Sequence, residues 1–290
     1  MNEEGILYDS VMICGSPDLE RRVEAYASIL GRDRVQISDT PGDVNGQNVI
    51  IDIRGQAEDK RRINDWQERG ALVISDALPA PTVEASRELM TTGRVLVGQW
   101  SRYDPRFQLI QQQLENGDIG PLVAVRWVSL WPEDCWLPEG VVENYAYSAL
   151  DALGTLMGTP KRIMARQLSL KRDVPDTLFA VIVAEETDAI GYLEISCCQP
   201  SGSTAEQIEV VGRSGILEYD SKVNRTLRHT GPHGSDLRDA FWEPPLAKML
   251  RHYMTLPEQE EQLSLTMQQM QDALALVERT LESCQTNLPA

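Results

Sequence analysis

The sequence predicts an α/β protein of two domains, with a doubly wound sheet in residues 1–120 and a large, mainly antiparallel open sheet in residues 121–290. Within the first hundred residues, short apolar runs alternate with longer amphipathic runs, which is typical of parallel strands joined by helices. After residue 120, strand-like runs follow one another with few helices between them. The length of 290 residues suits two ordinary domains or one large one.

Five strands are predicted in the first half, at residues 11–14, 34–38, 48–53, 71–75 and 94–100. Helices are predicted at 18–30, 57–70 and 81–93, where apolar side chains recur at helical spacing and glycine or Pro-Thr marks an end. The connection at 40–47 is too short for a crossover helix. The strands on either side of it therefore pair antiparallel, or a helix of the usual pattern has been deleted.

The second half begins after a predicted helix at 105–120 that ends in glycine. Its strands are predicted at 122–131, 161–170, 177–186, 189–198, 207–212 and 215–220. One helix is expected around Ala146 to Met157, and a long terminal helix at 256–283. This pattern gives an α+β domain whose sheet dominates.

Composition excludes several classes of function. A net charge of −17 argues against nucleic acid and anionic membranes as partners, because phosphates would be repelled. No apolar run is long enough to cross a bilayer, and the acidic start lacks the features of a signal peptide, so a cytoplasmic location is expected. Five cysteines without a C-x-x-C pair argue against a disulfide framework or a zinc site. Cys197 and Cys198 alternate faces of a strand and are expected to pack rather than to form a redox pair.

A resemblance to a known family appears where the two halves meet. Residues 97–127 hold a strand, an Arg-Tyr-x-Pro turn, a helix and a Gly-x-Ile-Gly segment. Residues 147–165 carry a helix ending in Leu-x-Gly-x-Pro, and residues 209–220 carry a Gly-x-x-Gly strand turn. From about residue 48 onward, this order resembles the glucose–fructose oxidoreductase and inositol dehydrogenase family (Gfo/Idh/MocA). The matching residues at the junction are Arg102, Tyr103, Pro105, Gly117, Ile119 and Gly120.

The resemblance implies a Rossmann domain that binds NAD or NADP, a second domain that often makes oligomer contacts, and hydride transfer on a sugar, polyol or similar small molecule. The Rossmann domain is degenerate, because the dinucleotide turn G-x-G-x-x-G falls on Gly15, Pro17 and Glu20. Pro17 lacks an N–H, and Glu20 places an anion beside the phosphate position. A capped helix with no ligand is favoured over a dinucleotide in the usual pose.

Other residues at the carboxyl edge of this sheet remain candidates for cofactor binding. Asp39 ends the second strand, where a ribose-binding acid is expected, although an ordinary turn residue is the alternative. Arg54 follows the third strand and could meet an anionic group or pair with a surface acid. Together with Gly15, Ser16 and Asp76, these residues form the predicted cofactor site.

The catalytic groups of the family are replaced at the positions where the resemblance puts them. Its Glu-Lys-Pro triplet falls on Asp76, Ala77 and Leu78, and alanine cannot move a proton. The histidine of its acid–base helix falls on Ser148, three residues before Asp151. Serine does not replace histidine as a base without activation.

Tyr147, Asp151 and Tyr103 are the remaining candidates for catalysis. In one interpretation, Tyr147 and Asp151 face the substrate cleft and Tyr147 donates a proton. In the other, Asp151 caps or pairs locally and the tyrosines pack. His229 and His233 have metal-like spacing, but the Gly and Pro between them predict a loop with two solvated histidines, and no metal site is expected.

The tryptophans offer one more candidate. Trp127, Trp131 and Trp136 are near in sequence, and residues 131–140 could form a loop over the cleft. Such a loop would stack on a sugar, or serve as a hydrophobic flap or an interface.

Three functions remain open. The first is a degenerate member of the family, a pseudoenzyme that has lost standard hydride transfer and acts as a small-molecule-binding, regulatory or partner subunit. The second is an NAD(P)-dependent oxidoreductase with a non-standard proton donor at Tyr147 and Asp151. The third is a structural subunit of a homo-oligomer, or of a hetero-oligomer with a related chain. The replaced glycines, lysine and histidine favour the first.

Overall fold

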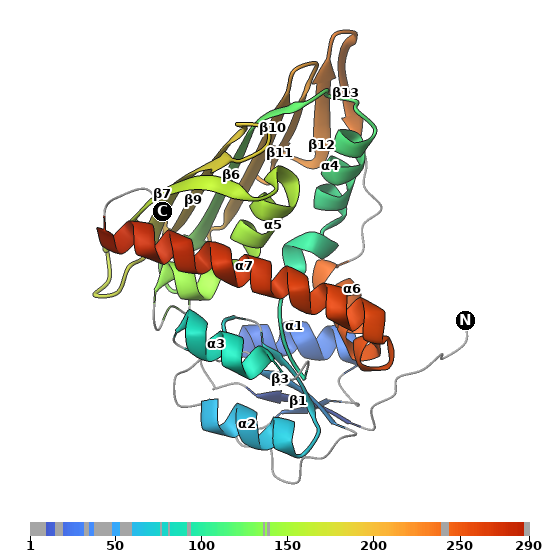
Figure 1. Ribbon diagram of the computed structural model, residues 1–290, viewed down its shortest axis with the longest axis vertical. Helices are drawn as coiled ribbons and strands as arrows, with labels where there is room; N and C mark the ends of the chain where they lie inside the picture. The colour runs from blue at the N-terminus through green and yellow to red at the C-terminus, as the bar shows by residue number, and fades with distance from the viewer. Residues whose placement is uncertain are drawn as a thin grey trace. The chain divides into compact units, whose positions relative to one another are not determined.

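The structure is a computed structural model of the whole chain. It describes residues 10–14, 20–31, 35–37, 48–52, 60–75, 77–80, 82–91, 94–135, 137, 140–238 and 244–286. The chain forms two compact units, each built around its own sheet (Figure 1). The first unit comprises Met1–Trp100 and Pro244–Leu274, and the second comprises Ser101–Glu243 and Ala275–Ala290. The predicted division at residue 120 differs from this grouping, which assigns residues 101–120 to the second unit and returns residues 244–274 to the first.

The first unit holds a parallel sheet of five strands in the order β2-β1-β3-β4-β5. The strands are β1 (Ser10–Cys14), β2 (Val35–Ile37), β3 (Asn48–Asp52), β4 (Leu72–Ser75) and β5 (Val95–Val97). All five predicted strands are therefore confirmed. The antiparallel pairing considered for β2 and β3 is wrong, because each lies beside β1 and runs parallel to it. Residues 38–47, which join them, lie outside the described residues.

Helices lie on both sides of this sheet, as a doubly wound fold requires. They are α1 (Glu20–Leu30), α2 (Lys60–Glu68), α3 (Val83–Met90), α6 (Pro245–Thr255) and the first part of α7 (Glu260–Thr286). Right-handed crossovers put α1 on one face and α2 and α3 on the other, because the chain moves in opposite directions along the sheet. Contacts between α1 and α6, and between α2 and α3, agree with this arrangement, and Figure 1 shows strands between α1 and α2.

Helix α6 was not predicted from the sequence. It begins at Pro245, which suits a first helical turn because proline lacks only an N–H that would have no intrahelical partner there. Its buried Tyr253 donates a hydrogen bond to the Val97 carbonyl at 2.9 Å and accepts one from the Gln99 N–H at 3.3 Å. This tyrosine therefore fixes α6 to the carboxyl end of β5.

The second unit holds an eight-stranded sheet in the order β13-β12-β11-β10-β6-β9-β8-β7. The strands are β6 (Leu122–Pro132), β7 (Pro160–Leu168), β8 (Thr177–Ala184), β9 (Ile190–Gln199), β10 (Ala205–Gly212), β11 (Ile216–Asp220), β12 (Asn224–Gly231) and β13 (Gly234–Arg238). Every pairing is antiparallel except that of β6 with β9, so the predicted open sheet is confirmed. Strands β12 and β13 were missed, because NRTLRHTG and GSDLR lack a regular apolar alternation.

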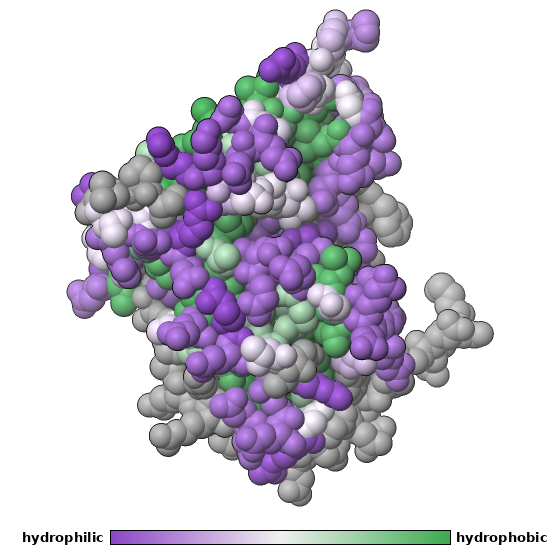
Figure 2. Space-filling view, in the orientation of Figure 1, coloured by the Kyte–Doolittle hydropathy of each residue, from purple (hydrophilic) through white to green (hydrophobic). Residues whose placement is uncertain are grey.

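One face of this sheet is covered by helices. Helix α4 (Pro105–Glu115) stacks Phe107 near Trp127 of β6, with 6.2 Å between the ring centroids. Helix α5 (Tyr147–Met157) contacts β6 and β9. Residues that alternate with Trp127 point to the opposite, outer face, where Arg126 is exposed. In Figure 2, hydrophilic side chains predominate among the coloured residues of the face that it shows, in keeping with the acidic composition.

Two of the family-like glycine motifs meet within this unit. A side chain at Gly212 would come within 2.1 Å of the Ile119 carbonyl oxygen, so only glycine fits there. The Ser214 N–H donates to the same carbonyl at 2.8 Å. The Gly-x-Ile-Gly segment before β6 and the Gly-x-x-Gly turn after β10 are therefore complementary parts of one packing arrangement.

Candidate functional site

The carboxyl edge of the first sheet is where a doubly wound fold binds its ligand, at the point where the strand order reverses. Here that point lies at β1, because β2 and β3 flank it on opposite sides. The predicted cofactor residues Gly15, Ser16, Asp39, Arg54 and Asp76 all lie outside the described residues. Their roles therefore stay predictions.

Residues 77–80 after β4 are described, and the sequence resemblance places the family's catalytic lysine at Ala77. Thr82 accepts a hydrogen bond from the Ala85 N–H at 3.1 Å and so caps α3, which supports the sequence register used for this segment. Leu78 is buried, and the Ala77 carbonyl accepts a hydrogen bond from the Ser75 hydroxyl at 2.7 Å. Residues 77–80 are Ala-Leu-Pro-Ala, so their side chains can neither donate nor accept a proton.

The three predicted catalytic residues come together in the second unit. Tyr147 and Asp151 lie on α5, which follows a π-helical turn at Val142–Ala146. Tyr103 lies on the 3₁₀ helix η4 (Trp100–Tyr103). Arg102 of η4 joins the two elements, donating from Nε and Nη2 to the two carboxylate oxygens of Asp151 at 2.6 Å each.

This ion pair is buried on the acid side. Asp151 is 2% exposed. A carboxylate at that depth needs a paired and hydrogen-bonded partner, because an isolated buried charge is very costly. The fork of a guanidinium satisfies both oxygens at once. Asp151 is therefore paired, as the second interpretation of the sequence has it, but its partner is 49 positions away and not local.

Both tyrosine hydroxyls keep their protons near neutral pH. Burial raises the pKa of Tyr147 well above its usual value, and the Asp151 carboxylate raises it further against the opposing effect of Arg102. Burial likewise raises the pKa of Tyr103, with Arg102 opposing and Asp151 adding to the shift. Either tyrosine is therefore a hydrogen-bond donor and not a base in this environment.

Ser148, at the position where the resemblance places the family's histidine, is also hydrogen-bonded within the protein. The Ser148 hydroxyl lies 2.8 Å from the Ser101 hydroxyl and accepts the Ser101 N–H at 3.2 Å. Both serines are buried. We name Ser101, Arg102, Ser148 and Asp151 the α5 cluster. Its polar groups hold η4 against α5.

The histidine and tryptophan expectations are corrected in part. His229 is not on a solvated loop but on β12, where its side chain is 14% exposed and its Nδ1 lies 3.2 Å from Asp236. His233 is exposed in the turn between β12 and β13. Trp127 and Trp131 belong to β6, and Trp131 packs on Tyr145 with 4.8 Å between ring centroids. Trp136 lies outside the described residues.

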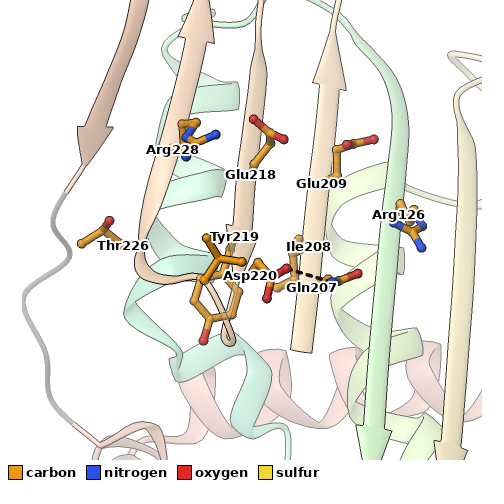
Figure 3. A pocket seen from close by; sticks show the side chains of 10 residues that line it. Arg126, Gln207, Ile208, Glu209, Glu218, Tyr219, Asp220, Thr226 and Arg228 are labelled. Atoms are coloured by element: carbon orange, nitrogen blue, oxygen red, sulfur yellow. Dashed lines mark hydrogen bonds between the residues drawn. The ribbon is translucent and has the colours of Figure 1, made fainter. Parts of the chain in front are cut away.

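A hollow of about 280 Å³ lies on the second unit's sheet, away from the α5 cluster (Figure 3). Arg126, Glu209, Glu218 and Arg228 stand opposite one another on β6, β10, β11 and β12. Their charges read plus, minus, minus, plus across the sheet. Because Arg126 is on the outer face and directly opposed residues share a face, this row belongs to the outer face.

Neither a metal site nor a membrane span is found in the part of the chain that the structure describes. No three His, Cys, Asp or Glu side chains among those residues are grouped so that they could hold a metal ion. No helix there is both long enough and apolar enough to cross a membrane.

Sequence reasoning missed two features of the second unit. The first is the pairing of Arg102 with Asp151, because Arg102 was considered only as part of a turn motif. The second is the proximity of Cys135 to Cys197, which are far apart in sequence. The parallel pairing of β6 with β9 sets the chain before Cys135 beside the end of β9, and no spacing pattern in the sequence signals it.

Comparison with known proteins identifies the fold. No family model and no curated protein matches the chain. Among solved structures, an oxidoreductase from Agrobacterium radiobacter in complex with NAD+, L-tartaric acid and magnesium is 16% identical, with 97% of this chain and 90% of that chain covered and a TM-score of 0.68. A putative myo-inositol dehydrogenase from Sinorhizobium meliloti is 16% identical, with 97% and 91% covered and a TM-score of 0.68. Levoglucosan dehydrogenase in complex with NADH is 14% identical, with 98% and 89% covered and a TM-score of 0.72. The fold predicted from the sequence is confirmed.

Proposed function

We propose that this chain, which has the fold of the Gfo/Idh/MocA oxidoreductases, binds a small polyhydroxylated molecule without carrying out the family's hydride transfer, and so acts as a binding, regulatory or partner subunit. The observation that carries this proposal is the closed α5 cluster. Both carboxylate oxygens of Asp151 are engaged by Arg102, and the Ser148 hydroxyl is engaged by Ser101. A carboxylate paired with a guanidinium in this way is stabilised in its charged form, which makes it a weaker base toward a substrate.

The loss of two proton-handling residue types also supports the proposal, because each such group contributes strongly to the rate. A positioned acid or base accelerates proton transfer by about 10²- to 10⁴-fold, provided that it lies within hydrogen-bond reach of the reacting atom. Residues 77–80 carry no ionisable side chain, and Ser148 stands in place of the histidine. Two proton-handling positions are therefore altered independently.

The alternative is an NAD(P)-dependent oxidoreductase in which Tyr147 or Asp151 serves as a non-standard proton donor. Levoglucosan dehydrogenase and the Agrobacterium radiobacter oxidoreductase hold NADH and NAD+, which favours nicotinamide binding. A bound nicotinamide would supply or accept the hydride. Tyr147 would then have to deliver the proton, but its side chain is 3% exposed.

The outer face of the second sheet supports assembly with a second copy of the chain. Within the row of Arg126, Glu209, Glu218 and Arg228, a two-fold axis that passes between an arginine and the neighbouring glutamate places that arginine opposite the partner's glutamate and that glutamate opposite the partner's arginine. Sedimentation or light scattering would detect the oligomer. The charge reversal Glu209→Lys with Glu218→Lys should weaken it, and the same reversal at the exposed Glu185 and Glu186 should not. A cytoplasmic location remains a prediction.

Ligand titration of the purified chain tests the function. We expect levoglucosan, myo-inositol or L-tartrate to raise the melting temperature, because a ligand that binds only the folded state stabilises it. We expect no substrate-dependent change in NADH or NADPH absorbance. Turnover with either cofactor that falls when Tyr147→Phe is introduced would instead establish the oxidoreductase. If no ligand changes the melting temperature, the proposed binding function is wrong and a structural subunit is the function that remains.

A gain-of-function variant makes the test sharper. Ala77→Lys combined with Ser148→His restores both residue types that the family uses. We expect this double variant to have more cofactor-dependent turnover than the parent chain. The control, Ala77→Lys combined with Ser148→Ala, should not. Turnover by the parent chain as high as that of an active double variant would contradict the proposed loss of activity.

A further inference from the structure

Two thiols meet at the carboxyl ends of neighbouring parallel strands in the second unit. Cys197 lies near the end of β9 and is fully buried, while Cys135 lies just beyond β6 and is half-buried. The parallel pairing of β6 with β9 sets Pro132 opposite Gln199, and the Glu133 N–H donates to the Gln199 carbonyl at 2.7 Å. The chain after β6 is thereby held against the end of β9, and the Cys135 and Cys197 thiols are close enough to interact.

The surroundings of Cys135 favour its thiolate. Arg172 donates from Nη2 to the Cys135 carbonyl at 2.9 Å, and the same nitrogen lies 3.9 Å from the sulfur. The Cys197 thiol, and to a lesser extent the Tyr145 hydroxyl and Arg172, lower the pKa of Cys135 to about 7 against the opposing effect of burial. The same contact and burial raise the pKa of Cys197. One thiol of the pair is thus disposed to be ionised while the other keeps its proton.

The loop that ends at Asp176 holds both cysteines in place. The Asp176 carboxylate accepts the main-chain N–H groups of Leu170, Lys171 and Arg172, with the shortest contact at 2.6 Å to Lys171. The carbonyl of the same Asp176 accepts the Cys197 N–H at 2.8 Å. One residue therefore orients the turn that carries Arg172 and fixes the backbone of Cys197.

We propose that Cys135 and Cys197 form a hydroperoxide-reactive thiol pair, in which Cys135 attacks the oxidant and Cys197 resolves the product. With hydrogen peroxide, the Cys135 thiolate attacks one peroxide oxygen, the O–O bond breaks, and hydroxide leaves and takes up the proton that the Cys135 thiol released, forming water. Cys135 is now a sulfenic acid. The Cys197 sulfur then displaces that hydroxyl, forming a disulfide and a second water. Overall, two thiols lose two electrons and two protons, and one hydroperoxide accepts them.

The other cysteines of the second unit serve as internal references. Cys198 follows Cys197 on β9 but faces the other side of the strand, where it lies 3.6 Å from the Thr177 hydroxyl. Burial raises the pKa of Cys284 on α7 to about 11. Cys284 should therefore be slow to react, and Cys198 tests whether a disulfide is specific for the side of β9 that Cys197 faces.

The first test needs no variant. The full chain is alkylated under native conditions with iodoacetamide between pH 5 and 10, and each cysteine is followed by mass spectrometry. We expect the rate at Cys135 to be half-maximal near pH 7 and to exceed that at Cys284 at least tenfold at pH 7, because the thiolate is the reacting species. Equal rates at Cys135 and Cys284 would overturn the proposal.

The second test identifies the product. The chain is treated with stoichiometric hydrogen peroxide and mapped without reduction, and a peptide joining Cys135 to Cys197 with loss of two hydrogens is expected. Cys197→Ser should leave a sulfenic acid on Cys135 that dimedone traps, and Cys135→Ser should abolish the linkage. The control Cys198→Ser should leave the linkage intact. A disulfide from Cys135 to Cys198, or oxidation of Cys135 with no disulfide in the parent chain, would show the pairing to be wrong.

Discussion

The α5 cluster and the thiol pair are two polar clusters of the same unit, and they differ in how their charges are balanced. In the α5 cluster, the Arg102 guanidinium meets the Asp151 carboxylate through two hydrogen bonds, so the charges cancel. At the thiol pair, Arg172 donates to the main-chain carbonyls of Glu133 and Cys135, which carry no net charge. Its positive charge therefore remains to stabilise an anion nearby. Asp151, a candidate for catalysis, is therefore held by a counterion, whereas Arg172 leaves a positive charge beside Cys135.

The largest effect should follow from breaking the ion pair of the α5 cluster. Arg102→Met leaves a carboxylate buried without its cation, which typically costs about 3–5 kcal/mol. Urea unfolding followed by circular dichroism at pH 7 measures this cost. Arg162→Met, the same change at an exposed position of β7, is the control and should shift stability by less than about 0.5 kcal/mol. A loss below about 1 kcal/mol for Arg102→Met would mean that the pair is dispensable.

Removing the anchor of the thiol pair should have the next largest effect. Asp176→Ala deprives three main-chain N–H groups of a charged acceptor, and hydrogen bonds to charged groups contribute about 1.5–3 kcal/mol. Urea unfolding measures the loss, with Asp173→Ala, an exposed residue of the same loop, as control. Equal stability of the two variants would show that the loop is held by other contacts.

The stabilisation by the Asp176 carboxylate should also depend on pH. Burial alone would raise the pKa of Asp176, but the hydrogen bonds from Leu170, Lys171 and Thr177 outweigh it and hold the pKa below its ordinary value. The stabilisation is therefore present above the unfolded pKa, near 4, and is lost as the pH falls through the lower folded pKa. Urea midpoints of the parent chain and Asp176→Ala should converge as the pH is lowered from 7 to 2. A constant difference would contradict the assignment.

A smaller effect is expected within the α5 cluster itself. Ser148→Ala removes one buried hydroxyl partner of Ser101 and should cost about 0.5–1.5 kcal/mol. Ser101→Ala combined with Ser148→Ala should cost less than the sum of the single changes, because the two hydroxyls contact each other. The double-mutant cycle measures this coupling by urea unfolding. Strict additivity would mean that the 2.8 Å contact contributes nothing.

The smallest effect tests whether the two clusters are independent. Ser148→Ala should change the alkylation rate of Cys135 by less than about twofold, because its hydrogen bonds do not involve the thiols. Asp176→Ala should slow that rate, because the turn that carries Arg172 loses its acceptor. The measurement is the native iodoacetamide rate at pH 7. A strong response to Ser148→Ala would join the clusters into one network.

Much of the fold could be predicted because its strands and helices have strong local patterns. The runs of Val, Ile and Leu in β1, β3 and β4 and the Thr82 cap of α3 each specify an element by themselves. Strands β12 and β13 could not be recognised, because polar strands at a sheet's end owe their pairing to a neighbour rather than to their own sequence. Helix α6 was missed for a related reason, since Tyr253 stabilises it through contacts with β5.

The sequence predicted which residues make up the candidate site but not the contacts that they make there. The sequence brought Tyr103, Tyr147 and Asp151 forward as a group, and the structure does bring them together. It could not reveal that Arg102 engages both oxygens of Asp151, because that contact joins η4 to α5 across 49 positions of sequence. The thiol pair depends in the same way on a long-range strand pairing.

Because the chain returns from the second unit to the first, the first unit cannot be completed until late in translation. Residues 244–274 complete the first unit, yet the ribosome must add the roughly 140 residues after Trp100 before they begin to emerge. At 5–20 residues per second, this takes about 7–30 s. During that interval the side of β5 that Tyr253 later secures has no α6 to cover it. Nascent chains should therefore need chaperone protection late in translation, and a pause introduced before residue 244 should lower the yield of native protein.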